Sequence, residues 1–206
     1  MTGLPEHTDL KGMIDRARDG EASARGKLLD GYRNYLTLLA RLTLRKRLQA
    51  KLSESDVVQE AFLEAHRDFP QFRGNTEKEL TGWLRKILAH NLANMVRHYC
   101  GTRGRDVKLE RELQFELERS SQAMDRALVA VQSSPSHQAS EREQMVLVAD
   151  ALKQLPTDYR EVLILRHLEG LSFPEVAKRM DRTLSSVDKL WVRALTKLRR
   201  ALGVVT

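Results

Sequence analysis

The chain has little of what disulfide-bonded, β-rich or membrane-spanning proteins require. It contains one cysteine, Cys100, so no disulfide can form within the chain, and this cysteine use suits a reducing compartment. Aromatic residues make up only 5% of the chain and β-branched runs are few, so we expect a fold that is nearly all helix. No apolar run reaches the roughly 18 residues that would suggest a membrane-spanning helix.

The chain also lacks the residue sets that enzymes and metal sites need. A thiol nucleophile needs a nearby histidine and an orienting partner, and a zinc site needs ligands at a characteristic spacing. The single cysteine and the six histidines show no such spacing. We therefore expect no catalytic residue, no metal and no cofactor, and a hydrolase or metalloenzyme is excluded as a reading.

The N-terminal segment, MTGLPEHTDLKG, has neither the basic start nor the apolar core of a signal peptide. Together with the absence of long apolar runs, this predicts a protein that stays in the cytoplasm and has no membrane partner.

Positive charge is what the chain has in excess. Lysine and arginine number 35 against 28 for aspartate and glutamate, which gives a formal net charge of +7 and a sequence pI near 9.7. Such a balance favours an anionic partner, and nucleic acid fits better than a membrane surface.

The most informative stretch runs from Leu171 to Ala194 and predicts two short helices at a sharp turn. Ser172 followed three residues later by Glu175 is the pattern of a capping box, which predicts a helix starting at Phe173. Helical apolar spacing is interrupted at 181–183, where Asp181 can adopt a left-handed backbone conformation at modest cost. Residues 182–203 include six basic residues and only one acid, Asp188. Charge alone would fit an ordinary solvated helix, but the capping box and turn together favour a DNA-binding helix-turn-helix.

Periodicity and composition predict how the chain is organised. Between Leu10 and Leu52 we expect one short and one longer amphipathic helix, followed by a helix from Ser53 to Pro70 and a long helix after the turn at 72–75. An acidic stretch then leads into SSPSHQAS at 133–140, which is typical of a linker. We therefore expect two small helical domains, residues 1–106 and 144–206, joined by a flexible linker at 107–143 that is partly helical or disordered. The C-terminal domain is expected to hold four helices, with the basic helix last.

Motifs in both halves resemble one family. Four motifs in the N-terminal half resemble region 2 of the extracytoplasmic-function (ECF) sigma factors of bacterial RNA polymerase, which belong to the sigma-70 family. They are DVVQEAF at 56–62, FRG at 72–74, WL at 83–84 and NLA at 91–93. Region 4 of the same factors is similar to LP at 155–156, YREVL at 159–163, EGLS at 169–172, Ala177 and RA at 193–194. The resemblance covers most of residues 10–105 and 145–203, in the family's order.

The resemblance implies a promoter-recognition subunit that binds core RNA polymerase, reads the minus-10 element of promoter DNA with region 2 and helps to melt it. It implies polymerase contacts at Asp56, Gln59, Glu60 and Glu64, whose spacing puts them along one side of a helix. It implies that Asn91 reads an extruded base, since its amide offers a donor and an acceptor. The cations placed to hold backbone phosphates are Arg85, Lys86, Arg97, Arg103 and Arg105. Trp83 lies in an apolar stripe and is expected to be core.

Region 4 is expected to read the minus-35 element. By position at the start of the last helix, the base-reading candidates are Arg182, Ser185, Ser186 and Lys189, and those for phosphates are Arg193, Lys197 and Arg200. Two residues depart from the family's pattern: Asp188 replaces a residue that is often basic, and Trp191 replaces a smaller apolar one. Asp188 can accept a hydrogen bond from a cytosine amino group, so the minus-35 preference is left open.

Two further points stay open at the level of sequence. The resemblance allows an anti-sigma factor as another partner, and no residue decides whether one exists. The alternative function is a stand-alone helix-turn-helix transcriptional regulator with an N-terminal sensor or dimerisation domain. Such a domain would show a ligand pocket or a dimer seam instead of polymerase-docking and strand-reading motifs.

Overall fold

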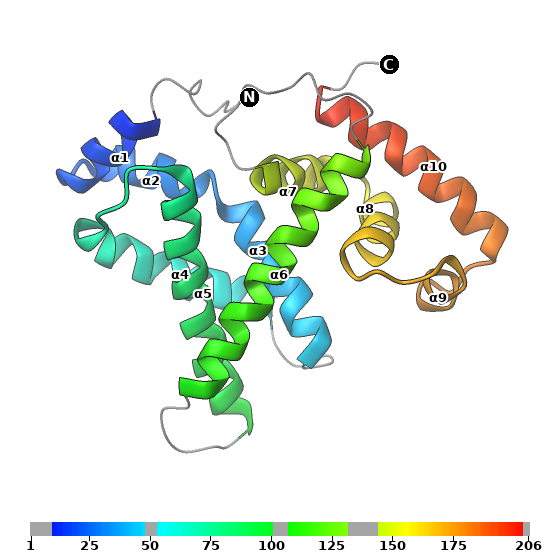
Figure 1. The fold of residues 1–206 in the computed structure, drawn as a ribbon, viewed down its shortest axis with the longest axis horizontal. Coiled ribbons are helices and arrows are strands. Elements are labelled where there is room, and N and C mark those ends of the chain that lie inside the picture. The colour runs from blue at the N-terminus through cyan, green and yellow to red at the C-terminus, as the bar shows by residue number, and fades with distance from the viewer. Residues whose placement is uncertain (1–9, 48–52, 101–106, 132–143, 204–206) are drawn as a thin grey trace. The chain divides into compact units, whose positions relative to one another are not determined.

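The computed structural model describes residues 10–47, 53–100, 107–131 and 144–203, and the described residues form helices joined by short turns, with no strand among them (Figure 1). The predicted all-α class is therefore confirmed. The chain divides into two compact units, residues 1–119 with 140–143 and residues 120–139 with 144–206. None of the described helices is both long and apolar enough to cross a membrane.

The first unit begins with three helices, α1 (Leu10–Arg18), α2 (Ala22–Asp30) and α3 (Arg33–Arg47), where periodicity predicted only two before Leu52. The first break is at Gly20, which takes a φ of 97°, a left-handed value that a glycine adopts at little cost. The second is at Gly31, which follows the last residue of α2. Apolar spacing continues across both breaks, so the pattern alone does not separate the helices.

The core of the first unit lies between α3, α4 (Glu54–Asp68) and α5 (Glu77–Cys100), which contact one another. Fully buried side chains from each of these helices and from the short 3₁₀ turn η2 (Phe69–Gln71) fill it, among them Tyr35, Ala65, Phe69 and Leu88. Trp83 packs its ring edge-on against Phe69 at a centroid distance of 5.7 Å. As expected from its apolar stripe, Trp83 is a packing residue.

The helix α6 (Val107–Val131) occupies much of the stretch expected to be a linker. Leu113 and Leu117, four residues apart, are both fully buried, so this helix has an apolar side that is covered. Of the two alternatives left open for this stretch, the described part is helical. The SSPSHQAS segment lies outside the described residues, and the boundaries given above for the domains stay a prediction.

The second unit contains α7 (Gln144–Gln154), α8 (Thr157–Leu163), α9 (Phe173–Arg179) and α10 (Leu184–Ala201), with a short π-helical segment η3 (Ile164–Leu168) continuing α8. The basic helix α10 comes last, as predicted, and packs against α7, α8 and α9. Val162, Ile164, Val176 and Val187 are fully buried between them. This small core fixes which side of α10 faces outward.

Candidate nucleic-acid interface

The turn between α9 and α10 is built by the residues that the sequence singled out. The carboxylate of Glu175 accepts hydrogen bonds from the hydroxyl of Ser172 at 2.6 Å and from its backbone N–H at 2.7 Å, so α9 starts at Phe173 as predicted. These bonds, that from the hydroxyl first, lower the pKa of Glu175. Asp181 takes a φ of 52°, the left-handed conformation expected at this turn.

The start of α10 has a cap that the sequence reasoning missed. The hydroxyl of Thr183 accepts a hydrogen bond from the backbone N–H of Ser186 at 3.3 Å, with Thr183 as the N-cap. The signal was present, since threonine at the end of the interruption at 181–183 is a preferred N-cap residue. Ser186 is half-buried whereas Ser185 is exposed, so of the two predicted serines Ser185 is the more accessible.

The inward side of α10 is anchored by Trp191. Its indole Nε1 donates a hydrogen bond to His167 Nε2 at 3.0 Å, and its ring meets that of Phe173 edge-on at 5.4 Å. Val187 and Ala194, on either side of Trp191 along the helix, are fully buried. Packing within the unit therefore accounts for the larger residue at 191.

The outward side of α10 carries the predicted cations. Two of the predicted residues have partners within the unit. Arg182 forms an ion pair with Asp158 at 2.6 Å, and Lys197 Nζ lies 5.5 Å from the ring centroid of Tyr159. Their basic groups remain exposed. Arg182 lies in the turn just before the helix, and together with the exposed candidates on α10 it forms one basic surface: Arg182, Ser185, Lys189, Arg193, Lys197 and Arg200.

The predicted polymerase-facing residues on α4 divide into two groups. Asp56, Gln59 and Glu60 are exposed and lie along one side of the helix, opposite the buried Val58 and Ala65. Glu64 is half-buried, and its carboxylate accepts a hydrogen bond from Asn91 Nδ2 at 2.6 Å. The stripe available to a partner therefore consists of the first three residues.

Asn91 is held in place on α5 through its amide nitrogen. Nδ2 donates to Glu64, and also to the backbone carbonyl of Ile87 at 3.0 Å. Within the part of the chain that the structure describes, Oδ1 accepts no hydrogen bond. The side chain is half-buried and oriented, with its acceptor oxygen left for a donor on a partner.

The cations predicted to line the minus-10 strand do not lie in equivalent places. Arg85 is only 8% exposed; it donates to the hydroxyl of Tyr35 at 2.8 Å and pairs with Glu118 at 2.9 Å. Burial and two protein partners occupy the guanidinium, so this geometry does not support its predicted phosphate contact. Lys86 is exposed, and Arg97 is half-buried and bonded to Asn94. Arg103 and Arg105 lie outside the described residues.

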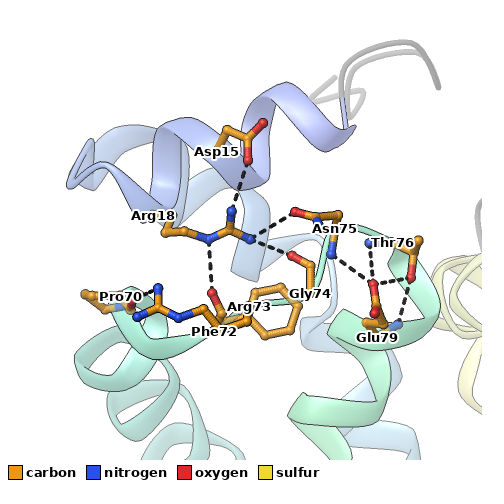
Figure 2. A network of polar contacts seen from close by, with 9 residues as sticks. All are labelled: Asp15, Arg18, Pro70, Phe72, Arg73, Gly74, Asn75, Thr76 and Glu79. Carbon is orange, nitrogen blue, oxygen red and sulfur yellow. Dashed lines mark hydrogen bonds and ion pairs between the residues drawn. The ribbon is translucent and has the colours of Figure 1, made fainter.

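A second polar network, also missed from sequence, fixes the loop that leads into α5 (Figure 2). Arg18 on α1 donates from Nε to the carbonyl of Phe72 at 3.0 Å and from Nη2 to that of Gly74 at 2.6 Å. Glu79 accepts from the backbone N–H groups of Asn75 and Thr76, and these bonds, that of Asn75 first, lower its pKa. Thr76 followed by Glu79 has the spacing of a capping box, the one signal that could have revealed part of it.

Two protein-family models match the sequence of this chain. Residues 32–99 match sigma-70 region 2, and residues 145–198 match sigma-70 region 4. The chain belongs to the sigma-70 family. It is an ECF sigma factor, as the motifs in its two halves predicted. The stand-alone regulator is not favoured, because region 2 spans the half of the chain where a sensor or dimerisation domain was required.

Relatives span nearly the whole length of this sigma factor. The chain is 27% identical over 197 residues to the ECF RNA polymerase sigma-E factor of Haemophilus influenzae, covering 93% of this chain and 94% of that one. It is 28% identical over 187 residues to the protein of the same name from Escherichia coli, with 88% of each chain covered. A chain in the solved structure of CnrH in complex with the cytosolic domain of CnrY is 21% identical, covers 96% of this chain and 99% of its own, and has a TM-score of 0.33. This sigma factor directs promoter-specific transcription initiation.

Proposed function

We propose that this sigma factor divides promoter recognition between three helices. The exposed stripe of α4, Asp56, Gln59 and Glu60, binds core RNA polymerase. Asn91 on α5 reads a base of the opened minus-10 strand, with Lys86, Arg97, Arg103 and Arg105 along the phosphates. The outward side of α10, with Arg182 in the turn before it, reads and holds the minus-35 element through Arg182, Ser185, Lys189, Arg193, Lys197 and Arg200.

One observation carries this proposal. The described residues of each proposed surface lie on or beside a helix whose opposite side is locked into a core, so their polar groups are oriented before a partner arrives. Preorganised groups lose less conformational freedom on binding than mobile ones do. On α10 the exposed charged groups are four cations and one acid, which favours phosphate, whereas on α4 two of the three residues of the stripe are acids, which favours a basic protein surface.

The remaining parts of the proposal follow from this role. The chain acts in the cytoplasm, where it meets polymerase and promoter DNA, and it has no catalytic activity of its own because the polymerase supplies the chemistry. The two relatives named above are sigma factors by name, and full-length coverage supports the same division of labour here. An anti-sigma factor stays a proposed further partner.

The role of Asn91 is tested by comparing two alanine variants on one helix. Asn91→Ala removes the oriented amide, whereas Asn94→Ala removes an exposed amide one turn further along α5. We expect Asn91→Ala to change the preferred minus-10 sequence by roughly tenfold at one position, as the loss of a base contact does, and to leave core affinity within about twofold. Preference is read by sequencing transcripts from a randomised minus-10 library. A loss of core affinity with unchanged preference would refute this assignment of α5.

The polymerase-binding stripe is tested by charge reversal. Glu60→Lys places a cation in the stripe, and Asp19→Lys makes the same change in charge at an exposed acid between α1 and α2. We expect Glu60→Lys to weaken binding to core polymerase by tenfold or more, on the order of the penalty for juxtaposed like charges, and Asp19→Lys to leave it within about twofold. Equal effects of both variants would show that net charge, and not this stripe, governs binding.

A further inference from the structure

One apolar side chain interrupts the basic side of α10. Val192 is 56% exposed, and it stands among Lys189, Arg193 and Thr196 on the outward side of the helix. Single exposed apolar residues are ordinary on protein surfaces. This one lies on the side of α10 that is proposed to bind DNA, where a cation would suit the phosphate backbone better.

The anchoring of α10 fixes the direction of Val192. The preceding residue, Trp191, is bonded to His167 and packed on Phe173, while Ala194 is fully buried. A rotation of the helix that buried Val192 would pull both anchors out of the core. The hydroxyl of Thr196 donates to the Val192 carbonyl at 3.1 Å, so the neighbouring polar group is directed at the backbone and the valine methyl groups form the surface.

The single acid of the basic helix lies beside this valine. Asp188 is exposed and precedes Val192 by four residues, so the two side chains are neighbours along one edge of the outward side. A carboxylate cannot bind phosphate, and it weakens the attraction of the surrounding cations for the DNA backbone. An acid and an aliphatic side chain, next to each other on the outward side of α10, do not serve backbone binding.

Both groups match base edges of the major groove. A carboxylate accepts a hydrogen bond from the amino group of cytosine, and an aliphatic side chain contacts the C5-methyl group of thymine. We propose that Asp188 and Val192 are a pair of specificity-determining residues that select a minus-35 element holding a cytosine and, within about two base pairs of it, a thymine. The spacing follows from one helical turn, about 5.4 Å, set against about 3.4 Å per base pair.

This inference rests on the proposed role of α10, and the experiment separates the two. The full chain with core polymerase first selects promoters from a library randomised in the minus-35 element. Selected elements should hold a cytosine and a thymine at that spacing. Each thymine of the best element is then replaced by deoxyuridine, which removes only the methyl group, and open-complex formation is measured.

The sharpest readout is a cycle of protein and DNA changes. For the unaltered chain, deoxyuridine at one position should weaken promoter binding by roughly fourfold, the value of one buried methyl-sized group. With Val192→Ala the same DNA change should have no effect beyond about 1.5-fold, since the contact is already lost. Val107→Ala makes the same substitution at a valine that is 51% exposed on α6, and it should leave the deoxyuridine effect intact.

The acid is tested in the same element. Asp188→Asn should move the preferred base at one position from cytosine towards adenine, because the asparagine amide pairs with adenine N6 and N7. A deoxyuridine effect that is equal in the unaltered chain and in Val192→Ala, or an unchanged base preference in Asp188→Asn, would overturn the inference while leaving α10 as the minus-35 reader. If replacement of the whole minus-35 element had no effect on the unaltered chain, the proposed role of α10 would fail instead.

Discussion

His167 and Trp191 form the polar contact that fastens α10 within its unit. His167 accepts the indole hydrogen bond through Nε2, so the ring must be unprotonated at that nitrogen. Burial, and then the neighbouring cation of Arg166, lower the pKa of His167. The neutral ring is therefore part of what holds the proposed DNA-reading helix in place.

The pH dependence of stability follows from the sign of this shift. An unfolded histidine takes up a proton near pH 6.5, whereas folded His167 resists protonation, so stability is complete above that pH and is lost as the pH falls below it. We expect the urea midpoint, followed by Trp191 fluorescence in a Trp83→Phe background, to fall between pH 8 and pH 5.5. In His167→Gln most of this fall should disappear. A urea midpoint that does not change with pH in the protein with His167 unaltered would contradict this account.

For Arg85, the role suggested by the sequence pattern differs from the environment of the side chain in the structure. It stands next to Lys86 in a basic stretch, yet its guanidinium is buried against Tyr35 and pairs with Glu118. We expect Arg85→Ala to lower the free energy of unfolding of the first unit by about 1–3 kcal/mol, because the Tyr35 hydroxyl and its surroundings lose a charged partner. Lys86→Ala, at an exposed position, should cost less than about 0.5 kcal/mol. Chemical denaturation of both variants measures the difference, and equal losses would refute the structural role of Arg85.

At the scale of elements, the loop before α5 is held by contacts on several of its residues. A Cβ atom added to Gly74 would meet the Phe72 ring and would lie 2.7 Å from the Glu79 Cβ, and Arg18 holds the Gly74 carbonyl from the other side. The loop cannot move away from such a clash without giving up these contacts. In contrast, a Cβ at Gly26, inside α2, would meet nothing within 4 Å.

Two glycine substitutions are therefore expected to change the free energy of unfolding in opposite directions. Gly74→Ala should lower the unfolding free energy of the first unit by about 1–3 kcal/mol through overpacking. Gly26→Ala should raise it by about 0.5–1 kcal/mol, because alanine favours the helix and space is free. Thermal unfolding of the two variants is the measurement. Stabilisation by Gly74→Ala would show that the loop is looser than its contacts imply.

Sequence predicted the elements best where a cap and a period coincide. The Ser172–Glu175 box placed the start of α9. Asp181, at a turn where glycine would adopt the left-handed conformation most easily, was expected to reach that conformation at modest cost, and it does so. Prediction failed where local signals are silent on long-range contacts. The spacing of apolar residues in 10–47 does not distinguish three helices from two. The hydrogen bonds of Arg18 join residues more than fifty positions apart, which no local pattern reveals.

The candidate site divides in the same way. Cations on α10 could be assigned from sequence, since helical spacing determines which residues share the side opposite the core. Three features each depend on how another helix packs against the residue, and helical spacing alone does not specify that packing. They are the burial of Arg85, the bond between Asn91 and Glu64 and the anchoring of Trp191. These three residues are where a pattern of residue types gave an incomplete account of function.

At the scale of the whole molecule, the central claim is that both halves act together on one promoter. Region 2 and region 4 occur in the family's order, and the proposal assigns to each a helix surface for its own contact. Loss of either surface should therefore reduce initiation, but in different ways. Changes on α10 should weaken recognition upstream, and changes on α5 should impair base selection in the opened strand.

The most direct test is transcription by sigma-free core polymerase supplied with the full chain and a library randomised in both promoter elements. We predict transcripts only when the chain is added, from templates enriched at two separated sites, with Asn91→Ala changing the downstream preference and Lys189→Ala the upstream one. Core binding by a folded chain without enrichment at either site would contradict the account.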